Sequence, residues 1–181
     1  AREDPERHAR SIALADALAN AGRGYEAAEA FLAAASAVEG AQNIDLRRRA
    51  ATEFLTSGDL PRGQQLMAEV CQAVGFRLPR GKTAALLSLA VTKTQLRWRK
   101  LDVDCSRPAR LSAVERLRVE VLQTAAVVLA AHDSLSAAVS ADRLLLLALQ
   151  TRDPRYMAAA LQLQAFFLTA LSPHEEEPIA R

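Results

Sequence analysis

The sequence has few aromatic residues, few cysteines and no long apolar run, and each shortage excludes a class of protein. Aromatic residues make up only 4% of the chain, and strand-forming residues are few beside alanine and leucine, so a β-sheet core is not expected. Cys71 and Cys105 lack metal-ligand spacing and are too few for a disulfide framework. The longest strictly apolar runs, 125–131 and 144–149, fall far short of the roughly 20 residues that cross a bilayer.

The net charge and the start of the sequence indicate the class of partner and the cellular compartment. The net charge of +2 favours neither a nucleic-acid nor a membrane partner. The sequence shows no signal peptide, and a reducing cytoplasm fits its free cysteines. Because it does not begin with methionine, we interpret it as an excised piece of a longer protein.

Half of the residues are apolar, mostly alanine and leucine, which is typical of closely packed helices. Two copies of one pattern occupy residues 12–38 and 48–74. With Gly22 aligned on Gly58, Ala15 matches Ala51, Leu18 matches Phe54, Ala27 matches Gly63, Phe31 matches Met67 and Ala34 matches Val70. Small residues at the crossings let helix axes approach, and we expect Gly22 and Gly58 to end helices in left-handed backbone. Asn43 is expected to cap a helix that begins at Ile44.

These copies resemble the tetratricopeptide repeat family, whose unit is a helix–turn–helix of about 34 residues. Ser11 and Arg47 stand where that family often has tryptophan, and Glu39 and Gly75 where it often has proline. The resemblance implies an all-α, right-handed α-solenoid of helical hairpins, with about seven helices. We expect this domain to occupy residues 1–172 and to be followed by a flexible acidic tail at 173–181.

First helices in that family line a concave groove that holds a peptide or a partner helix. The matching positions are Ile12, Asp16, Asn20, Asp45, Arg48, Thr52 and Thr56. Polar side chains there could hydrogen-bond an extended partner backbone; the simpler interpretation is that they are solvated. The resemblance therefore implies a protein-interaction module.

A narrower resemblance rests on residues 47–51, the stretch Gly-Phe-Arg-Leu-Pro-Arg at 75–80, Leu-Leu-Ser-Leu at 86–89, and Arg97-Trp98-Arg99. They are similar to the helical C-terminal region of large bacterial serine/threonine kinases that also carry an ATPase module. This resemblance implies a sensing or docking scaffold beside catalytic modules. No kinase motif is present here, so we expect this chain not to be an enzyme, whatever its parent does.

Two features of the second half bear on packing. Leu87, Val91, Thr94, Trp98 and Leu101 recur at helical spacing and are expected to form one core-facing stripe. The helix expected at 134–151 contains the run Leu144–Leu149, which is apolar all round, and should be covered on several sides. With the helix at 154–171, it is also a candidate homodimer surface.

Two alternatives to a protein partner remain open. The basic cluster of Arg97, Arg99, Lys100, Arg107 and Arg110 could contact phosphates while Trp98 stacks on a base, although Asp102 and Asp104 dilute it. The other alternative is a small-molecule sensor, with a pocket between the long helices around Trp98. Neither a cofactor nor a metal is expected, because residues 75–83 put five residues, not four, between glycines and the histidines lie far apart.

Overall fold

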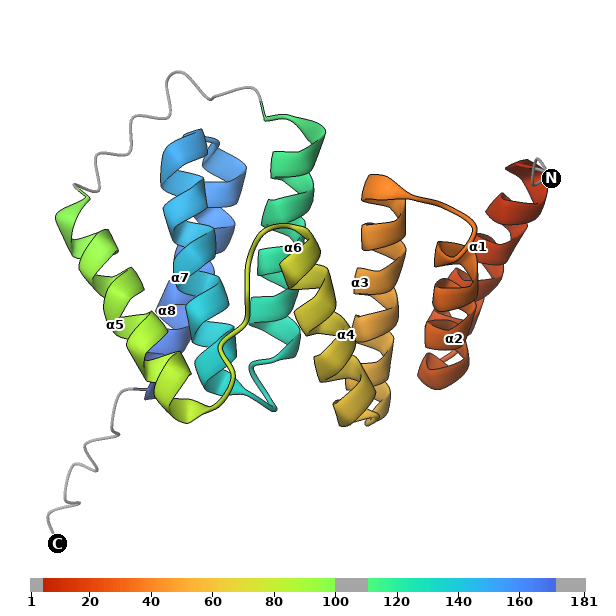
Figure 1. Cartoon of the computed structure of the whole chain (residues 1–181), viewed down its shortest axis with the longest axis horizontal. Coiled ribbons are helices and arrows are strands. Elements are labelled where there is room, and N and C mark those ends of the chain that lie inside the picture. The colour runs from red at the N-terminus through yellow and green to blue at the C-terminus, as the bar shows by residue number, and fades with distance from the viewer. Residues whose placement is uncertain (1–4, 100–110, 172–181) are drawn as a thin grey trace, which may run out of the picture.

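The computed structural model describes residues 5–99 and 111–171, and within them every regular element is a helix (Figure 1). These residues form eight helices, where the sequence indicated about seven. The helices are Pro5–Asn20 (α1), Gly24–Ala35 (α2), Gly40–Ser57 (α3), Leu60–Ala73 (α4), Lys82–Trp98 (α5), Ala113–Val128 (α6), Ser134–Thr151 (α7) and Pro154–Leu171 (α8). The acidic tail predicted at 173–181 lies outside the described residues. The all-α prediction is confirmed for the part that is described.

The first four helices form two antiparallel hairpins side by side, as the repeat predicted. Consecutive helices pack against one another from α1 to α4 (Figure 1). Gly22 and Gly58 follow α1 and α3 with φ of 73° and 93°, so the predicted left-handed helix ends are confirmed. Ala27 is fully buried, and a Cβ on Gly63 would lie 2.6 Å from Cγ of Leu55. Small residues therefore do allow the helices to approach closely.

The start of α3 differs from the prediction. The helix begins at Gly40 instead of Ile44, and Asn43 is already inside its first turn. The Asn43 amide donates to the carbonyls of Ala35 and Val38, at 2.7 and 3.2 Å. Ala35 is the last residue of α2 and Val38 lies in the loop that follows, so the Asn43 side chain bonds back to the end of α2 and that loop and does not cap the start of α3.

The order of the helices in space departs from their order in the chain. α6, not α5, packs against α3 and α4 and so lies beside the second hairpin. α5 lies at the far end of the row and packs against α7 (Figure 1). The segment after α4 carries the chain past α6 to reach that position. As a result, α5 and α6 flank α7 from different sides.

α7 is the centre of the second half, and α5, α6 and α8 all pack against it. Twelve of its residues are buried, so the prediction that this helix is covered on several sides is confirmed. A homodimer surface made by both leucine-rich helices is therefore wrong in part, because α7 is not accessible. Of these two helices, α8 is the one with exposed large apolar side chains among the described residues, namely Leu161, Phe166 and Leu168.

The predicted core-facing stripe of α5 is also wrong. Leu87, Val91 and Trp98 are 68%, 44% and 85% exposed. The side of α5 that faces α7 instead buries Ala85 and Thr92. Since α5 carries apolar residues around much of its circumference, periodicity alone did not select the buried side. The Thr92 hydroxyl, which donates to a buried carboxylate on α7, identifies the side that packs.

Candidate functional site

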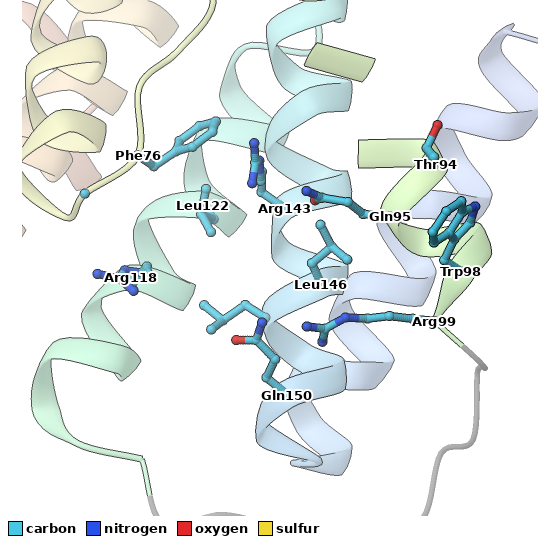
Figure 2. Close-up of a pocket in the computed structure, with 12 residues that line it drawn as sticks. Phe76, Thr94, Gln95, Trp98, Arg99, Arg118, Leu122, Arg143, Leu146 and Gln150 are labelled. Atoms are coloured by element: carbon cyan, nitrogen blue, oxygen red, sulfur yellow. The ribbon is translucent and has the colours of Figure 1, made fainter. Parts of the chain in front are cut away.

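A pocket of about 640 Å³ opens between α5, α6 and α7, beside the segment that follows α4 (Figure 2). Such a volume lies within the range of roughly 300–1,000 Å³ that small-molecule sites occupy. Its described lining residues are Gly75, Phe76, Thr94, Gln95, Trp98, Arg99, Arg118, Leu122, Arg143, Leu146, Leu147 and Gln150. Three helices and a loop thus meet around one cavity of ligand size.

Three arginines line this pocket, one from each helix. Arg99 follows the last residue of α5, Arg118 lies on α6 and Arg143 on α7. In Figure 2 the Arg99 side chain extends toward α7 from one side, while Arg118 lies on the opposite side. No aspartate or glutamate is among the described lining residues. The pocket is therefore strongly cationic.

The arginines differ in how they are held. Arg118 Nε donates to the carbonyl of Val74 at 2.8 Å, which fixes its guanidinium near the loop. Arg143 Nε is buried and has no hydrogen-bond partner among the described residues. A buried donor without a partner carries a desolvation cost of roughly 1–3 kcal/mol, and more for a charged group. The site is thus left with unused capacity to donate hydrogen bonds.

Local sequence signals set the positions of two of these arginines. Ser112 and Glu115 form the predicted capping box, which fixes the start of α6 and hence the direction of Arg118. The hydrogen bonds from the backbone and side chain of Ser112 lower the pKa of the Glu115 carboxyl. Asp133 caps α7 by accepting from the Ser136 N–H at 3.1 Å. These caps fix where α6 and α7 begin, and so where Arg118 and Arg143 lie.

Next to Arg143, Asp142 joins three helices through a polar cluster. Its carboxylate is 1% exposed and accepts from Thr92 Oγ1 at 2.9 Å, Lys93 Nζ at 2.7 Å and Gln164 Nε2 at 2.7 Å. Lys93 also donates to Gln164 Oε1 at 3.1 Å. Successive residues of a helix point about 100° apart, so Asp142 faces this cluster while Arg143 faces the pocket. The cluster therefore ties α5 and α8 to α7 behind the pocket wall.

The charged residues of the predicted partner groove already have partners. Asp16 on α1 pairs with Arg49 on α3, which is not itself a predicted groove residue. Burial lowers the pKa of Arg49. Arg48 donates to Asp45 at 2.6 Å and to Thr124 Oγ1 of α6 at 2.9 Å. These charges hold α1, α3 and α6 together and are not left free for a peptide.

Most of the uncharged residues of the predicted groove also make their contacts within the molecule. Thr52 and Thr56 donate to carbonyls of their own helix, at 3.1 and 3.0 Å. Ile12 is half-buried against the core. Asn20 is exposed at the end of α1. Much of the hydrogen-bonding capacity predicted for this face is therefore used within the molecule.

The predicted basic cluster is divided. Arg97 is exposed on α5, whereas Arg99 lines the pocket. Lys100, Arg107 and Arg110 lie outside the described residues. Of these five residues, the structure therefore describes only Arg97 and Arg99, and the predicted basic patch stays a prediction.

Sequence reasoning placed a small-molecule pocket around Trp98 as an alternative, but it did not identify Arg118, Arg143 or Asp142. One signal was present: Asp142 and Arg143 are the only charged residues between Ser134 and Gln150. An acid and a base alone in a long apolar helix indicate polar groups with a specific role. For Arg118 no comparable signal exists, because α6 has other charged residues near it.

Within the described residues, no three histidine, cysteine or acidic side chains are placed to hold a metal ion, and no helix is long and apolar enough to cross a membrane. Comparison with known proteins gives no match to a protein family, to a curated protein or to a solved structure.

Proposed function

We propose that this chain is a non-catalytic sensing scaffold that binds a small molecule in the pocket between α5, α6 and α7. The observation that supports this most is a cavity of about 640 Å³ with a buried guanidinium nitrogen that has no partner. By contrast, the groove along α1 and α3 has its charges paired. The geometry therefore favours a small molecule over a peptide.

For the scaffold we propose a right-handed, tetratricopeptide-like solenoid. The two hairpins, the left-handed glycines at the helix ends and the close crossing at Gly63 support it. One feature departs from a regular array, since α6 takes the place beside α3 and α4 that α5 would fill. The pocket lies where the regular stacking ends, between the displaced α5 and α6.

We further propose that the scaffold is a regulatory region of a bacterial serine/threonine kinase with an ATPase module, acting in the cytoplasm. This proposal depends on the sequence stretches at 47–51, 75–80, 86–89 and 97–99. The gene's full reading frame tests it directly. An upstream kinase domain would support the proposal, and its absence would refute it.

The small-molecule function is tested by a thermal-shift screen of metabolite mixtures against the 181-residue chain, followed by tryptophan fluorescence. Trp98 is the only tryptophan and lines the pocket, so its emission reports on binding there. A hit should raise the melting temperature, because a ligand stabilises the state that it binds. It should also change Trp98 emission.

As a control, Arg116→Gln alters an exposed arginine on α6 outside the pocket, and hits should be retained. Arg143→Gln alters the pocket itself, and hits should be lost. Hits that survive Arg143→Gln and leave Trp98 emission unchanged would place the ligand elsewhere and refute this site.

A protein partner is the second candidate, and the exposed apolar residues of α8 favour it. Leu161, Phe166 and Leu168 are 45%, 53% and 62% exposed. Large apolar side chains on one accessible helix are typical of association surfaces. Light scattering over a range of concentrations tests whether that partner is a second copy of the chain; a constant monomer mass that Phe166→Ser leaves unchanged would exclude a homodimer.

Nucleic-acid binding has less support. Trp98 is exposed between Arg97 and Arg99, as stacking on a base requires, but only these two residues of the predicted basic cluster are described, and Arg99 also lines the pocket. Retention on single-stranded DNA that falls steeply with salt and is lost in an Arg97→Gln, Arg99→Gln variant would favour this alternative.

A further inference from the structure

The charges around the pocket indicate what kind of small molecule it accepts. A guanidinium is always protonated at physiological pH and offers up to five N–H donors in a planar fork. Arg99 and Arg143 form no hydrogen bond or ion pair with another described side chain, and Arg118 uses one nitrogen on the Val74 carbonyl. Three cationic groups therefore face one cavity whose described lining contains no acid.

Like charges in a partly enclosed space repel one another, and burial strengthens that repulsion. An arginine kept in such a place without an acid costs stability unless a bound anion compensates. Several other arginines in this protein are paired, such as Arg10 with Glu6, Arg49 with Asp16, and Arg62 with Glu29, whereas Arg97 and Arg116, which have no ion pair among the described residues, are exposed to water. The pocket differs from that arrangement.

The remaining lining residues add an apolar surface and neutral polar groups. Leu122, Leu146 and Leu147 come from α6 and α7, and Phe76 and Trp98 supply aromatic rings (Figure 2). Gln95 and Gln150 provide amide groups that can both donate and accept. An inorganic anion alone would leave this apolar surface unused.

We propose that the pocket binds an organic anion, a phosphate or carboxylate group carried on an apolar body, with the anionic group held by Arg99, Arg118 and Arg143. The apolar body lies against Leu122 and Leu146. This inference depends on the proposed small-molecule function and specifies its ligand class. Arginine suits both head groups, because its two parallel N–H bonds match two oxygens of a carboxylate or a phosphate.

The same ligand would connect α5 to α6, which otherwise have no substantial contact. Arg99 belongs to the end of α5 and Arg118 to α6, so one anion held by both joins the two helices. This gives binding a structural effect, since α5 is otherwise attached through α7.

Isothermal titration calorimetry on the 181-residue chain tests the inference with four matched probes. They are hexyl phosphate, hexanoate, hexanol and inorganic phosphate. We expect a hexyl anion to bind at least tenfold more tightly than hexanol and than inorganic phosphate. Comparison of hexyl phosphate with hexanoate identifies the preferred head group.

Two variants locate the binding. Arg143→Met removes the guanidinium, whose Nε is buried, and keeps an apolar chain of similar length; we expect roughly 10- to 100-fold weaker binding of the hexyl anion, since hydrogen bonds to charged groups contribute about 1.5–3 kcal/mol. The same change should leave the free protein as stable as the parent or more stable, because an uncompensated charge is gone. A merely structural arginine would give the opposite effect on stability. Arg97→Gln is the matched control on α5, outside the pocket, and should bind like the parent.

The outcomes separate the two proposals. Equal binding of hexanol and the hexyl anions would overturn the anion assignment and leave the small-molecule function standing. Anion binding that is unchanged in Arg143→Met would also overturn the assignment. No heat with any of the four probes, together with a metabolite screen without a hit, would overturn both.

Discussion

Replacing Asp142 with alanine tests whether the buried polar cluster holds the second half of the molecule together. The carboxylate accepts three hydrogen bonds of 2.7–2.9 Å and is 1% exposed. Breaking a buried ion pair costs roughly 3–5 kcal/mol. Two observations reduce this figure: Lys93 is 52% exposed and can return to water, and the single hydroxyl proton of Thr92 can turn to the Ser88 or Leu89 carbonyl instead. We therefore expect Asp142→Ala to lower the free energy of unfolding by about 2–3 kcal/mol.

For a chain of this size, that loss lowers the melting temperature by roughly 4–12 °C. Urea denaturation followed by circular dichroism at 222 nm measures the change in unfolding free energy. Glu120→Ala, an exposed acid on α6, is the control and should change stability by less than about 0.5 kcal/mol. A double-mutant cycle with Lys93→Ala then measures the coupling between positions 93 and 142. If Asp142→Ala behaves like Glu120→Ala, or if the coupling is zero, the reasoning about this cluster is refuted.

Three further predictions concern single positions. Gly63→Ala should destabilise the protein by about 1–2 kcal/mol, because overpacking against Leu55 exceeds the gain in helix propensity; Gly24→Ala, where the nearest contact would be 3.1 Å from the Ser57 Cβ, should cost less in the same urea assay. Burial raises the pKa of the Cys71 thiol from 9.0 to about 12, so the unfolded chain loses this proton at lower pH than the folded chain. Stability should then fall by about 1.4 kcal/mol per pH unit above pH 9, a slope that is absent in Cys71→Ala; equal slopes would contradict the prediction. Ser112→Ala removes the capping box of α6 and should cost about 0.5–2 kcal/mol in thermal unfolding, with an unchanged melting temperature as the contrary result.

The first half of the fold was predictable from the sequence because its signals are local. Gly22 and Gly58 end their helices in left-handed backbone, and Gly63 must be small because Leu55 occupies the space of a Cβ. Each of these requirements acts through neighbouring residues or through one helix crossing. Because the pattern occurs twice, it also predicted two helical hairpins. Asn43 is the exception, since its amide finds acceptors at the last residue of α2 and in the loop after it, which the sequence did not indicate.

The second half was less predictable because its packing depends on contacts between residues that lie far apart in the sequence. α5 has apolar residues on several sides, and the side that is buried was decided by Asp142 on another helix. The pocket arginines come from three separate helices, and nothing local indicates that Arg99, Arg118 and Arg143 meet. Placing the pocket near Trp98 was possible from the lengths of the helices. That the pocket is cationic could be seen only from the folded structure, where the three arginines lie around one cavity.

Because α5 packs mainly against one neighbour, α7, there is a consequence for the apparent strength of binding. Only Ala85 and Thr92 of this helix are buried, so its amide hydrogens should exchange through partial openings of lower free energy than global unfolding. A ligand that needs α5 in place binds only the closed fraction, and its measured dissociation constant rises in inverse proportion to that fraction. The strength of the Thr92–Asp142–Lys93 attachment thus sets the concentration range over which the protein would respond.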